Sequence, residues 1–316
     1  MYFCEYTTEE KIEVAKQLKN YSFEQCAMDY KKLKGAYHDG KLYEIKPLSL
    51  IGIKFVEHFT YCELLNTKSK QGLSFYDFWY HKEKYMNRDN STKNLIEYIK
   101  KEKPKLNEIK QAKKVFNIYY GSIDVFRPTI AMKIYDKFKP TCVLDFTMGW
   151  GGRLVGFSAT NLPKYIGIDY NKNLEKPYQI MCKYLEQEST TQCDLRFQDA
   201  LTVDYSTLEY DMVFTSPPFY NKEIYGDKQD SRSKEEWNEG FYKPLFQKTW
   251  LNLKDGGHYC LNVPATLYET ICIPLFGNAN EMLEMNKFSR TLPIRETERK
   301  NVGQKYKEYI YIWKKN

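Results

Sequence analysis

The segment from residue 143 to 153 constrains the fold of this chain more than any other. It begins as a short apolar strand and runs into a turn that contains Gly149 and Gly151, and residues 154–159 read as the start of a helix. Glycine lets a backbone turn tightly and approach a ligand closely, as in nucleotide-binding strand–turn–helix units. The phosphate-binding pattern G-x-x-x-x-G-K-[ST] does not occur, so a nucleoside without phosphates fits this turn better than ATP.

Acidic residues end this strand and the next two strand-like segments. Asp145 ends the first, Asp169 follows about 24 residues later at the end of segment 165–169, and Asp199 ends segment 195–199. The first spacing is the one at which such folds hold ribose hydroxyls. A single acid at such a point is more often a helix cap or turn former. Three in succession predict one ligand that lies across the carboxyl edge of a parallel sheet.

The apolar segment 210–214 is followed by Thr215 and then by Ser216, Pro217, Pro218 and Phe219. Prolines have a fixed φ and no N–H, so the carbonyls around them are presented as acceptors at the edge of the sheet. An amino group on a ring can dock there while the Phe219 side chain stacks on that ring. The alternative is an ordinary loop after a buried strand. Combined with the acid-ending strands, the segment predicts a pocket for a flat, amino-bearing group.

These two motifs together resemble those of the S-adenosylmethionine-dependent amino-methyltransferases that act on DNA. The cofactor motif of that family, V-L-D-P-F-x-G-x-G, is matched by residues 143–151, and its catalytic motif, [DNS]-P-P-[YFW], by residues 216–219. The resemblance covers roughly residues 126–316. It implies an α/β fold with a doubly wound, Rossmann-like methyltransferase sheet of the seven-stranded type, a mostly helical N-terminal domain, and S-adenosylmethionine as the cofactor.

The resemblance also implies roles for individual residues. Asp145 and the turn after it would hold the methionine end of the cofactor, Asp169 the ribose, and Asp199 the adenine amino group. Phe146 and Thr147 stand where the family has Pro-Phe, so Phe146 or Trp150 would supply the aromatic contact. The cofactor-binding residues implied are Asp145, Phe146, Thr147, Met148, Gly149, Gly151, Asp169, Asp199 and, in an extra supporting motif, Phe126 and Thr129; the catalytic residues are Ser216, Pro217, Pro218 and Phe219.

A serine at the head of the catalytic motif is commoner in family members that methylate N4 of cytosine. We therefore expect cytosine N4 in DNA, with N6 of adenine in DNA or RNA left open. Ser216 Oγ and the Pro217 carbonyl would accept the two N–H bonds, localise the amine lone pair and aim it at the sulfonium methyl group. Neither a histidine base nor a metal is required. A protein glutamine substrate and a catalytically silent nucleic-acid-binding subunit are the remaining alternatives.

A base in a duplex must be flipped out of the base stack to reach such a pocket, which costs roughly a few kcal/mol. The polar loop 220–232 follows the catalytic motif, and we expect Tyr220, Lys222 and Tyr225 in it to contact the substrate. Its alternative interpretation is a solvated surface loop.

A formal net charge of +7 fits contacts with nucleic-acid phosphates. Basic residues gather in segments 93–114 and 290–307, although a lysine run is often only a solvated helix face. The cysteines form no C-x-x-C pair and no run is apolar enough to cross a membrane, which favours a cytoplasmic or nuclear protein.

Two domains are expected, a helical domain over residues 1–115 that takes part in target recognition and the methyltransferase domain over residues 116–316. Few residues follow the catalytic motif, so target recognition falls to the N-terminal region, to the loop after Phe219 or to a partner. A homodimer, a separate specificity subunit and a restriction partner stay open.

Overall fold

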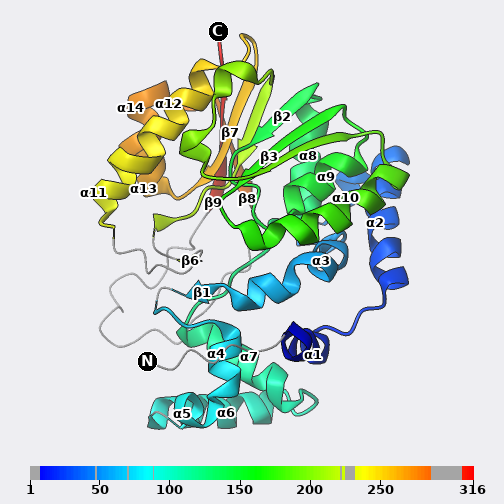
Figure 1. Cartoon of the computed structure of the whole chain (residues 1–316), viewed down its shortest axis with the longest axis vertical. Helices are drawn as coiled ribbons and strands as arrows, with labels where there is room; N and C mark the ends of the chain where they lie inside the picture. The colour runs from blue at the N-terminus through cyan, green and yellow to red at the C-terminus, as the bar shows by residue number, and fades with distance from the viewer. Residues whose placement is uncertain are drawn as a thin grey trace.

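The computed structural model of this chain describes residues 8–46, 48–69, 71–87, 89–220, 223–224, 232–285 and 308–316. Its N-terminal part is mostly helical, as expected, and the helices within residues 75–119 lie at the opposite end of the long axis from the C-terminus (Figure 1). The elements there are α1 (Thr8–Leu18), α2 (Phe23–His38), η1 (Leu42–Glu44), α3 (Ile53–Asn66), β1 (Lys68–Ser69), α4 (Phe75–Tyr80), α5 (Lys82–Met86), α6 (Asn90–Glu102) and α7 (Glu108–Tyr119).

The rest of the chain forms a seven-stranded sheet with strand order β4-β3-β2-β5-β7-β9-β8. Strand β9 runs antiparallel to both of its neighbours, and the other adjacent strands pair in parallel. Numbered along the chain, this is the order 3-2-1-4-5-7-6 of the Rossmann-like methyltransferase sheet, so the expected fold class is confirmed. The strands are β2 (Cys142–Asp145), β3 (Lys164–Asp169), β4 (Gln192–Phe197), β5 (Met212–Thr215), β7 (His258–Val263), β8 (Glu281–Met285) and β9 (Glu308–Lys314).

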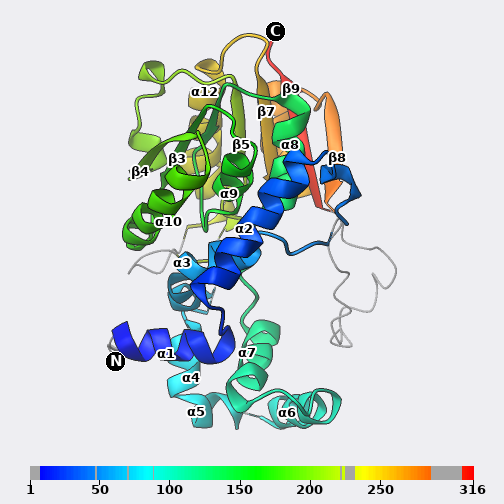
Figure 2. The same cartoon turned by 90° about the vertical axis from the view of Figure 1, so that its right-hand side faces the viewer.

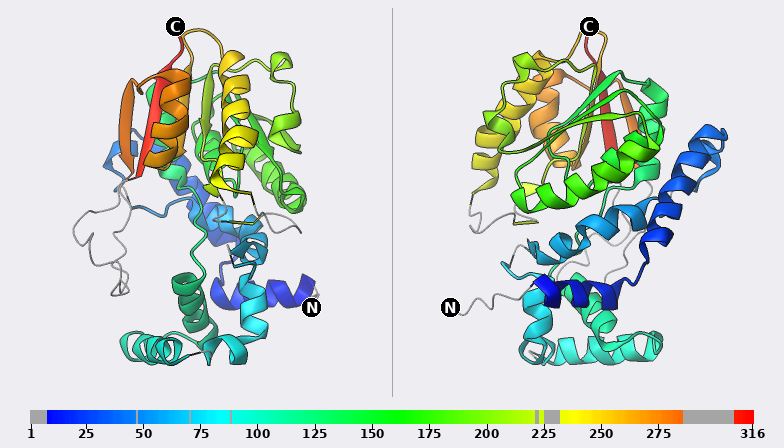
Figure 3. Two further views of the ribbon diagram at one scale, coloured as in Figure 1. Left: turned by 90° about the vertical axis from the view of Figure 1, so that its left-hand side faces the viewer. Right: turned by 45° about the vertical axis from the view of Figure 1, so that its right-hand side comes forward.

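Helices cover both faces of the sheet (Figure 3). Because both faces of the central strands are therefore buried, their sequences are near-continuous apolar runs. One face packs against α8 (Pro128–Phe138), α9 (Gly152–Ala159) and α10 (Glu175–Glu188), with η2 (Lys172–Leu174) before α10. The other packs against η3 (Ala200–Thr202), η4 (Tyr205–Thr207), α11 (Lys234–Trp237), the π-helical turn η6 (Asn238–Tyr242), α12 (Lys243–Leu251), α13 (Ala265–Leu267), η7 (Tyr268–Cys272) and α14 (Ile273–Phe276).

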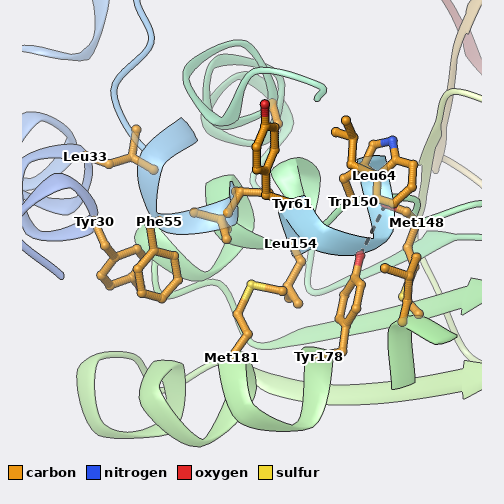
Figure 4. Packing of buried hydrophobic residues seen from close by; sticks show 14 of the residues in the cluster. Tyr30, Leu33, Phe55, Tyr61, Leu64, Met148, Trp150, Leu154, Tyr178 and Met181 are labelled. Carbon is orange, nitrogen blue, oxygen red and sulfur yellow. Dashed lines mark hydrogen bonds between the residues drawn. The ribbon is translucent and has the colours of Figure 1, made fainter. Parts of the chain in front are cut away.

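The N-terminal helices α2 and α3 share one hydrophobic core with the α8–α10 face of the sheet (Figure 2). Tyr30 of α2 and Phe55 of α3 place their ring centroids 5.0 Å apart, and the Tyr30 hydroxyl lies 3.0 Å from Ser158 Oγ of α9. Figure 4 shows Leu64 of α3 beside Trp150, which belongs to the glycine-rich turn. Helix α3 is therefore packed directly against the turn that the sequence assigns to the cofactor.

Two boundaries differ from the sequence-based expectations. Helix α7 continues through residue 115 to Tyr119, so the division placed between 115 and 116 falls inside a helix. Strand β4 spans Gln192–Phe197 rather than 195–199, because Asp199 already caps η3 through a 2.9 Å bond from the Leu201 N–H. In the described part of the chain, no helix is long and apolar enough to cross a membrane.

Candidate active site

The two sequence motifs meet at the carboxyl ends of β2 and β5. These strands are neighbours, and the strand order reverses between them, which is where open α/β sheets bind ligands. The hydroxyl oxygens of Thr147, in the glycine-rich turn, and Thr215, before Ser216, lie 2.6 Å apart. The structure therefore joins the expected cofactor turn to the expected catalytic segment by a direct hydrogen bond.

Asp145 is fully buried beneath this junction. Its two oxygens accept bonds from Arg153 Nε at 2.7 Å and Nη2 at 3.1 Å, from the Tyr165 hydroxyl at 2.5 Å and from Thr215 Oγ1 at 2.7 Å. Arg153 Nη2 also donates to the Thr147 carbonyl. Four donors occupy a carboxylate that offers about four acceptor sites. Asp145 therefore orders the turn and the end of β5 from below.

The glycine-rich turn has backbone that only glycine adopts readily. Gly149 has φ +58° and Gly151 has φ +95°. A Cβ built on Gly149 would meet nothing nearer than the Thr147 carbonyl oxygen at 3.9 Å, so the turn has open space on that side. The Tyr178 hydroxyl donates to the Gly149 carbonyl from beneath at 2.9 Å.

Asp169 at the end of β3 is tied to the same turn. Its Oδ2 accepts from the Gly149 N–H at 2.8 Å, and its Oδ1 accepts from the Asn171 N–H at 2.9 Å. Burial raises the pKa of Asp169 to about 6, although these two backbone bonds favour the charged carboxylate and act in the opposite direction. A buried carboxylate with a raised pKa beside an open turn is a candidate binding group, because a polar ligand could supply it with further hydrogen-bond donors.

The other residues of the turn are mostly inside the protein. Phe146 is fully buried against the opposite face, with its ring centroid 6.0 Å from that of Phe246. Met148 and Trp150 are 1% and 6% exposed. Thr60 Oγ1 of α3 donates to the Trp150 carbonyl at 3.3 Å. The side chains of Phe146 and Trp150, which were expected to supply an aromatic contact, are thus packed in the two cores.

The remaining expected cofactor residues lie in different surroundings. The Phe126 ring lies over the Arg153 guanidinium, 5.2 Å from centroid to carbon, close to the turn. Thr129 is buried and lines a cavity of about 220 Å³ between α8 and the pair β8–β9, together with Met285 and Ile310. Asp199 is half-buried, lies two residues beyond the end of β4 and caps η3.

Ser216 is half-buried and its hydroxyl donates to Asn262 Oδ1 of β7 at 3.0 Å. Asn262 is 2% exposed, and its Nδ2 donates to the Tyr309 carbonyl of β9 at 3.0 Å. Asn262 is not among the site residues that the sequence predicted. The available signal was an amide inside an otherwise apolar strand, one residue before the strand ends.

A tyrosine that the sequence analysis also missed holds the proline segment from the other side. The Tyr242 hydroxyl of η6 donates to the Pro218 carbonyl at 2.6 Å and accepts from the Tyr220 N–H at 2.9 Å. Tyr220 has φ +54°, a strained value for a tyrosine, and its hydroxyl donates to Asn238 Oδ1 at 3.2 Å. The half-buried Phe219 lies between these fixed points.

The N-terminal region reaches both halves of this site. Glu63 Oε1 of α3 accepts from Asn171 Nδ2 and Asn173 Nδ2, each at 3.1 Å, just beyond Asp169. Strand β1, which follows α3, pairs antiparallel with β6 (Glu223–Ile224) in the loop after Phe219. Lys222, Tyr225 and the basic segment 290–307 lie outside the described residues.

The lysines of segment 93–114 divide into two kinds. Lys113 is packed between aromatic rings, with Nζ 5.0 Å from the Phe75 centroid and 4.9 Å from that of Phe116, and burial lowers its pKa to about 8. It is therefore a half-buried side chain that packs on the aromatic rings of the helical region and donates to Asn117 Oδ1 at 2.9 Å. The exposed members are Lys93, Lys100, Lys101, Lys103, Lys105, Lys110 and Lys114.

No model of a protein family matches the chain, and no curated protein matches it. Among solved structures it is similar to TrmN from Thermus thermophilus, with 14% identity over 60% of this chain and 49% of that one, and a TM-score of 0.42. The chain thus spans about half of TrmN. It is also similar to an rRNA methylase from Streptococcus thermophilus, with 13% identity over 61% of this chain and 100% of that one, and a TM-score of 0.37. It is similar to a comparable degree to the [4+2]-cyclase SpnF, with 12% identity over 50% of this chain and 59% of that one, and a TM-score of 0.37.

Proposed function

We propose that this chain is an S-adenosylmethionine-dependent methyltransferase. The observation that supports this most directly is the junction of the glycine-rich turn and the Ser-Pro-Pro-Phe segment through Thr147 and Thr215 at the reversal of strand order. Open space beside Gly149 and the carboxylate of Asp169 fit the methionine end and the ribose of the cofactor. When bound, the cofactor supplies an electrophilic methyl group on sulfur.

Within this class, the acceptor is the exocyclic amine of a nucleic-acid base, cytosine N4 in DNA before adenine N6 in DNA or RNA. The amine lone pair is delocalised into the ring, so the protein must localise it. Ser216 Oγ keeps its lone pairs for one N–H bond. Among the residues that the structure describes, none donates to the Pro217 carbonyl, which leaves it for the second. The half-buried Phe219 supplies a face on which the base stacks.

Methyl transfer forms the N–CH₃ bond as the S–CH₃ bond breaks. The resulting cationic amine is strongly acidic and loses its proton to water, so the reaction needs no dedicated base. The chain contributes position and acceptors at the developing positive charge.

The test is incubation of the purified full chain with isotope-labelled S-adenosylmethionine and unmodified duplex DNA, single-stranded DNA or RNA. Nucleoside digestion and mass spectrometry then identify the product. Labelled N4-methylcytosine supports the cytosine assignment, and labelled N6-methyladenine keeps the mechanism but changes the base. Cofactor binding without any labelled nucleoside would overturn the nucleic-acid substrate and direct attention to protein amides.

A further inference from the structure

We propose that Asn262 fixes Ser216 as a hydrogen-bond acceptor, so that the site selects an amino group over a carbonyl group at the same ring position. This inference rests on the proposed function, because it concerns how the same pocket recognises its base. Asn262 is a positioning residue in this proposal, since it acts through Ser216.

The orientation of the Asn262 amide follows from its two partners. Its nitrogen donates to a main-chain carbonyl, that of Tyr309 in the neighbouring strand, which can only accept. Its oxygen must then face Ser216, 3.0 Å away. Because Asn262 is 2% exposed and lies within paired strands, this orientation is held by the sheet itself.

The fixed amide determines the chemistry of the serine. A hydroxyl has one proton and two lone pairs, and it normally rotates to suit its partner. Here the proton of Ser216 is committed to Asn262 Oδ1, so Oγ presents only lone pairs to the half-open side of the residue. A serine without this partner would donate to a carbonyl as readily as it accepts from an amine.

The consequence is a difference between bases that share a shape. Cytosine and adenine place an amine, a donor, where uracil and hypoxanthine place a carbonyl, an acceptor. With Ser216 Oγ and the Pro217 carbonyl both accepting, an amine makes two bonds and a carbonyl meets two acceptors. Sites built around a hydrogen bond reject analogues that cannot make it by large factors.

The test measures binding rather than turnover. Short single-stranded DNAs that are identical except for one cytosine or uracil, and a second pair with adenine or hypoxanthine, are titrated against the full chain in saturating S-adenosylhomocysteine. The readout is the ratio of the two dissociation constants in each pair. We expect the wild-type chain to prefer the amine of its own target base by at least about ten-fold.

Two substitutions at one position separate recognition from a structural role. Asn262→Ala removes the acceptor for Ser216, and we expect the ratio to fall to within about two-fold of one. Asn262→Asp keeps an oxygen that accepts from Ser216 but loses the amide nitrogen bonded to Tyr309, and we expect it to retain the preference. Asn262→Ser, whose side chain is too short to replace the amide, serves if the alanine variant does not fold.

The outcomes are distinct. A preference kept by Asn262→Asp and lost by Asn262→Ala supports the proposal. Equal ratios in these two variants, whether both kept or both lost, overturn the role of Asn262 while leaving the proposed function standing. A wild-type chain that binds both members of each pair equally, or binds neither member in single-stranded DNA, in the matching duplex or in RNA, overturns the amine pocket and with it the proposed substrate.

Discussion

At the scale of single residues, the carboxylates on the sheet edge have two kinds of surroundings. Asp145 is enclosed by donors from Arg153, Tyr165 and Thr215, whereas Asp169 lies beside open space at Gly149. Burial opposes the charge of both Asp145 and Arg153, and each compensates the other. The first carboxylate has its acceptor sites occupied by protein side chains, whereas the second accepts from two backbone N–H groups of the surrounding turns.

Arg153→Ala should destabilise the protein by about 3–5 kcal/mol, because it leaves the charge of Asp145 buried and unpaired. The matched control is Arg196→Ala, which removes an ion pair with Asp194 whose side chains are both 32% exposed. That pair should contribute less than about 1 kcal/mol. Urea unfolding of both variants measures the difference, and equal losses would contradict the buried-anchor role.

Asp169 makes cofactor binding depend on pH. The pKa of Asp169, about 6, lies above the ordinary value of about 3.9 for an aspartate. Protonation of Asp169 therefore stabilises the ligand-free folded state, and this stabilisation is lost as the pH rises through 6. In the proposed site the charged form of Asp169 accepts from the ribose hydroxyls, so we expect the cofactor affinity to weaken by about ten-fold for each pH unit below 6. Calorimetric titration of the cofactor at several pH values measures this. Asp169→Asn should bind weakly with no slope, and an unchanged slope would remove Asp169 from the ribose site.

Ser216→Ala should lower the rate of methyl transfer by roughly ten- to hundred-fold, less than the loss of an oxyanion-hole donor because the Pro217 carbonyl remains. Cofactor affinity should stay as in the wild type, since no bond in the glycine-rich turn involves Ser216 Oγ. The control is Ser206→Ala, an exposed hydroxyl bonded to Asp204. Single-turnover kinetics and cofactor titration separate the two quantities, and weakened cofactor binding would refute the assigned role.

At the scale of elements, the start of α9 is where the segment before α8 approaches most closely. A Cβ added to Gly152 would lie 1.9 Å from the Phe126 carbonyl oxygen. Gly152→Ala should therefore cost about 3 kcal/mol of stability by forcing this backbone apart. Gly35→Ala in α2, where nothing lies within 4 Å of the new Cβ, should stabilise by about 0.5–1 kcal/mol. Thermal unfolding compares them, and tolerance of both would show that the contact is not tight.

The sequence predicted the elements well where periodicity and burial agree. Strand β3 (Lys164–Asp169) differs by only one residue from the expected segment 165–169, because an apolar run there ends in an acid. The helical stretch formed by α11 and α12 contains the π-helical turn η6 between them. One extra residue in a helical turn has little sequence signature, yet it directs Tyr242 at the Pro218 carbonyl. Asn262 could not be predicted as a site residue for a similar reason. Its role depends on Ser216 and Tyr309, which become its neighbours only in the folded chain.

At the scale of the whole molecule, the carboxyl edge of the sheet faces the helical N-terminal region (Figure 1). Helix α3 contacts the glycine-rich turn through Thr60, and β1 pairs with β6 beyond Phe219. These contacts join segments about 90 to 155 residues apart in the chain, so no local pattern could predict them. The arrangement places α6 and α7, with their exposed lysines, at the end of the molecule beyond that edge (Figures 1 and 2).

A nucleic acid that enters the site from this side would extend toward the lysines of α6 and the segment after it. Counterion release makes the salt dependence of binding report the number of phosphate contacts, with about 0.9 added to the slope for each contact on duplex DNA. Replacing Lys100, Lys101, Lys103 and Lys105 by glutamine should reduce the slope by about two to four. Fluorescence anisotropy with one duplex at several salt concentrations measures it.

The matched control replaces four lysines of the opposite part of the molecule, Lys137, Lys248, Lys254 and Lys315, which already bond to protein oxygens. Both variants lose the same formal charge, so a general electrostatic effect would lower both slopes alike. A specific phosphate track on the helical region lowers only the first. Equal salt-dependence slopes in the two variants would mean that the nucleic acid does not contact these lysines. The helical region would then serve only to pack against the glycine-rich turn.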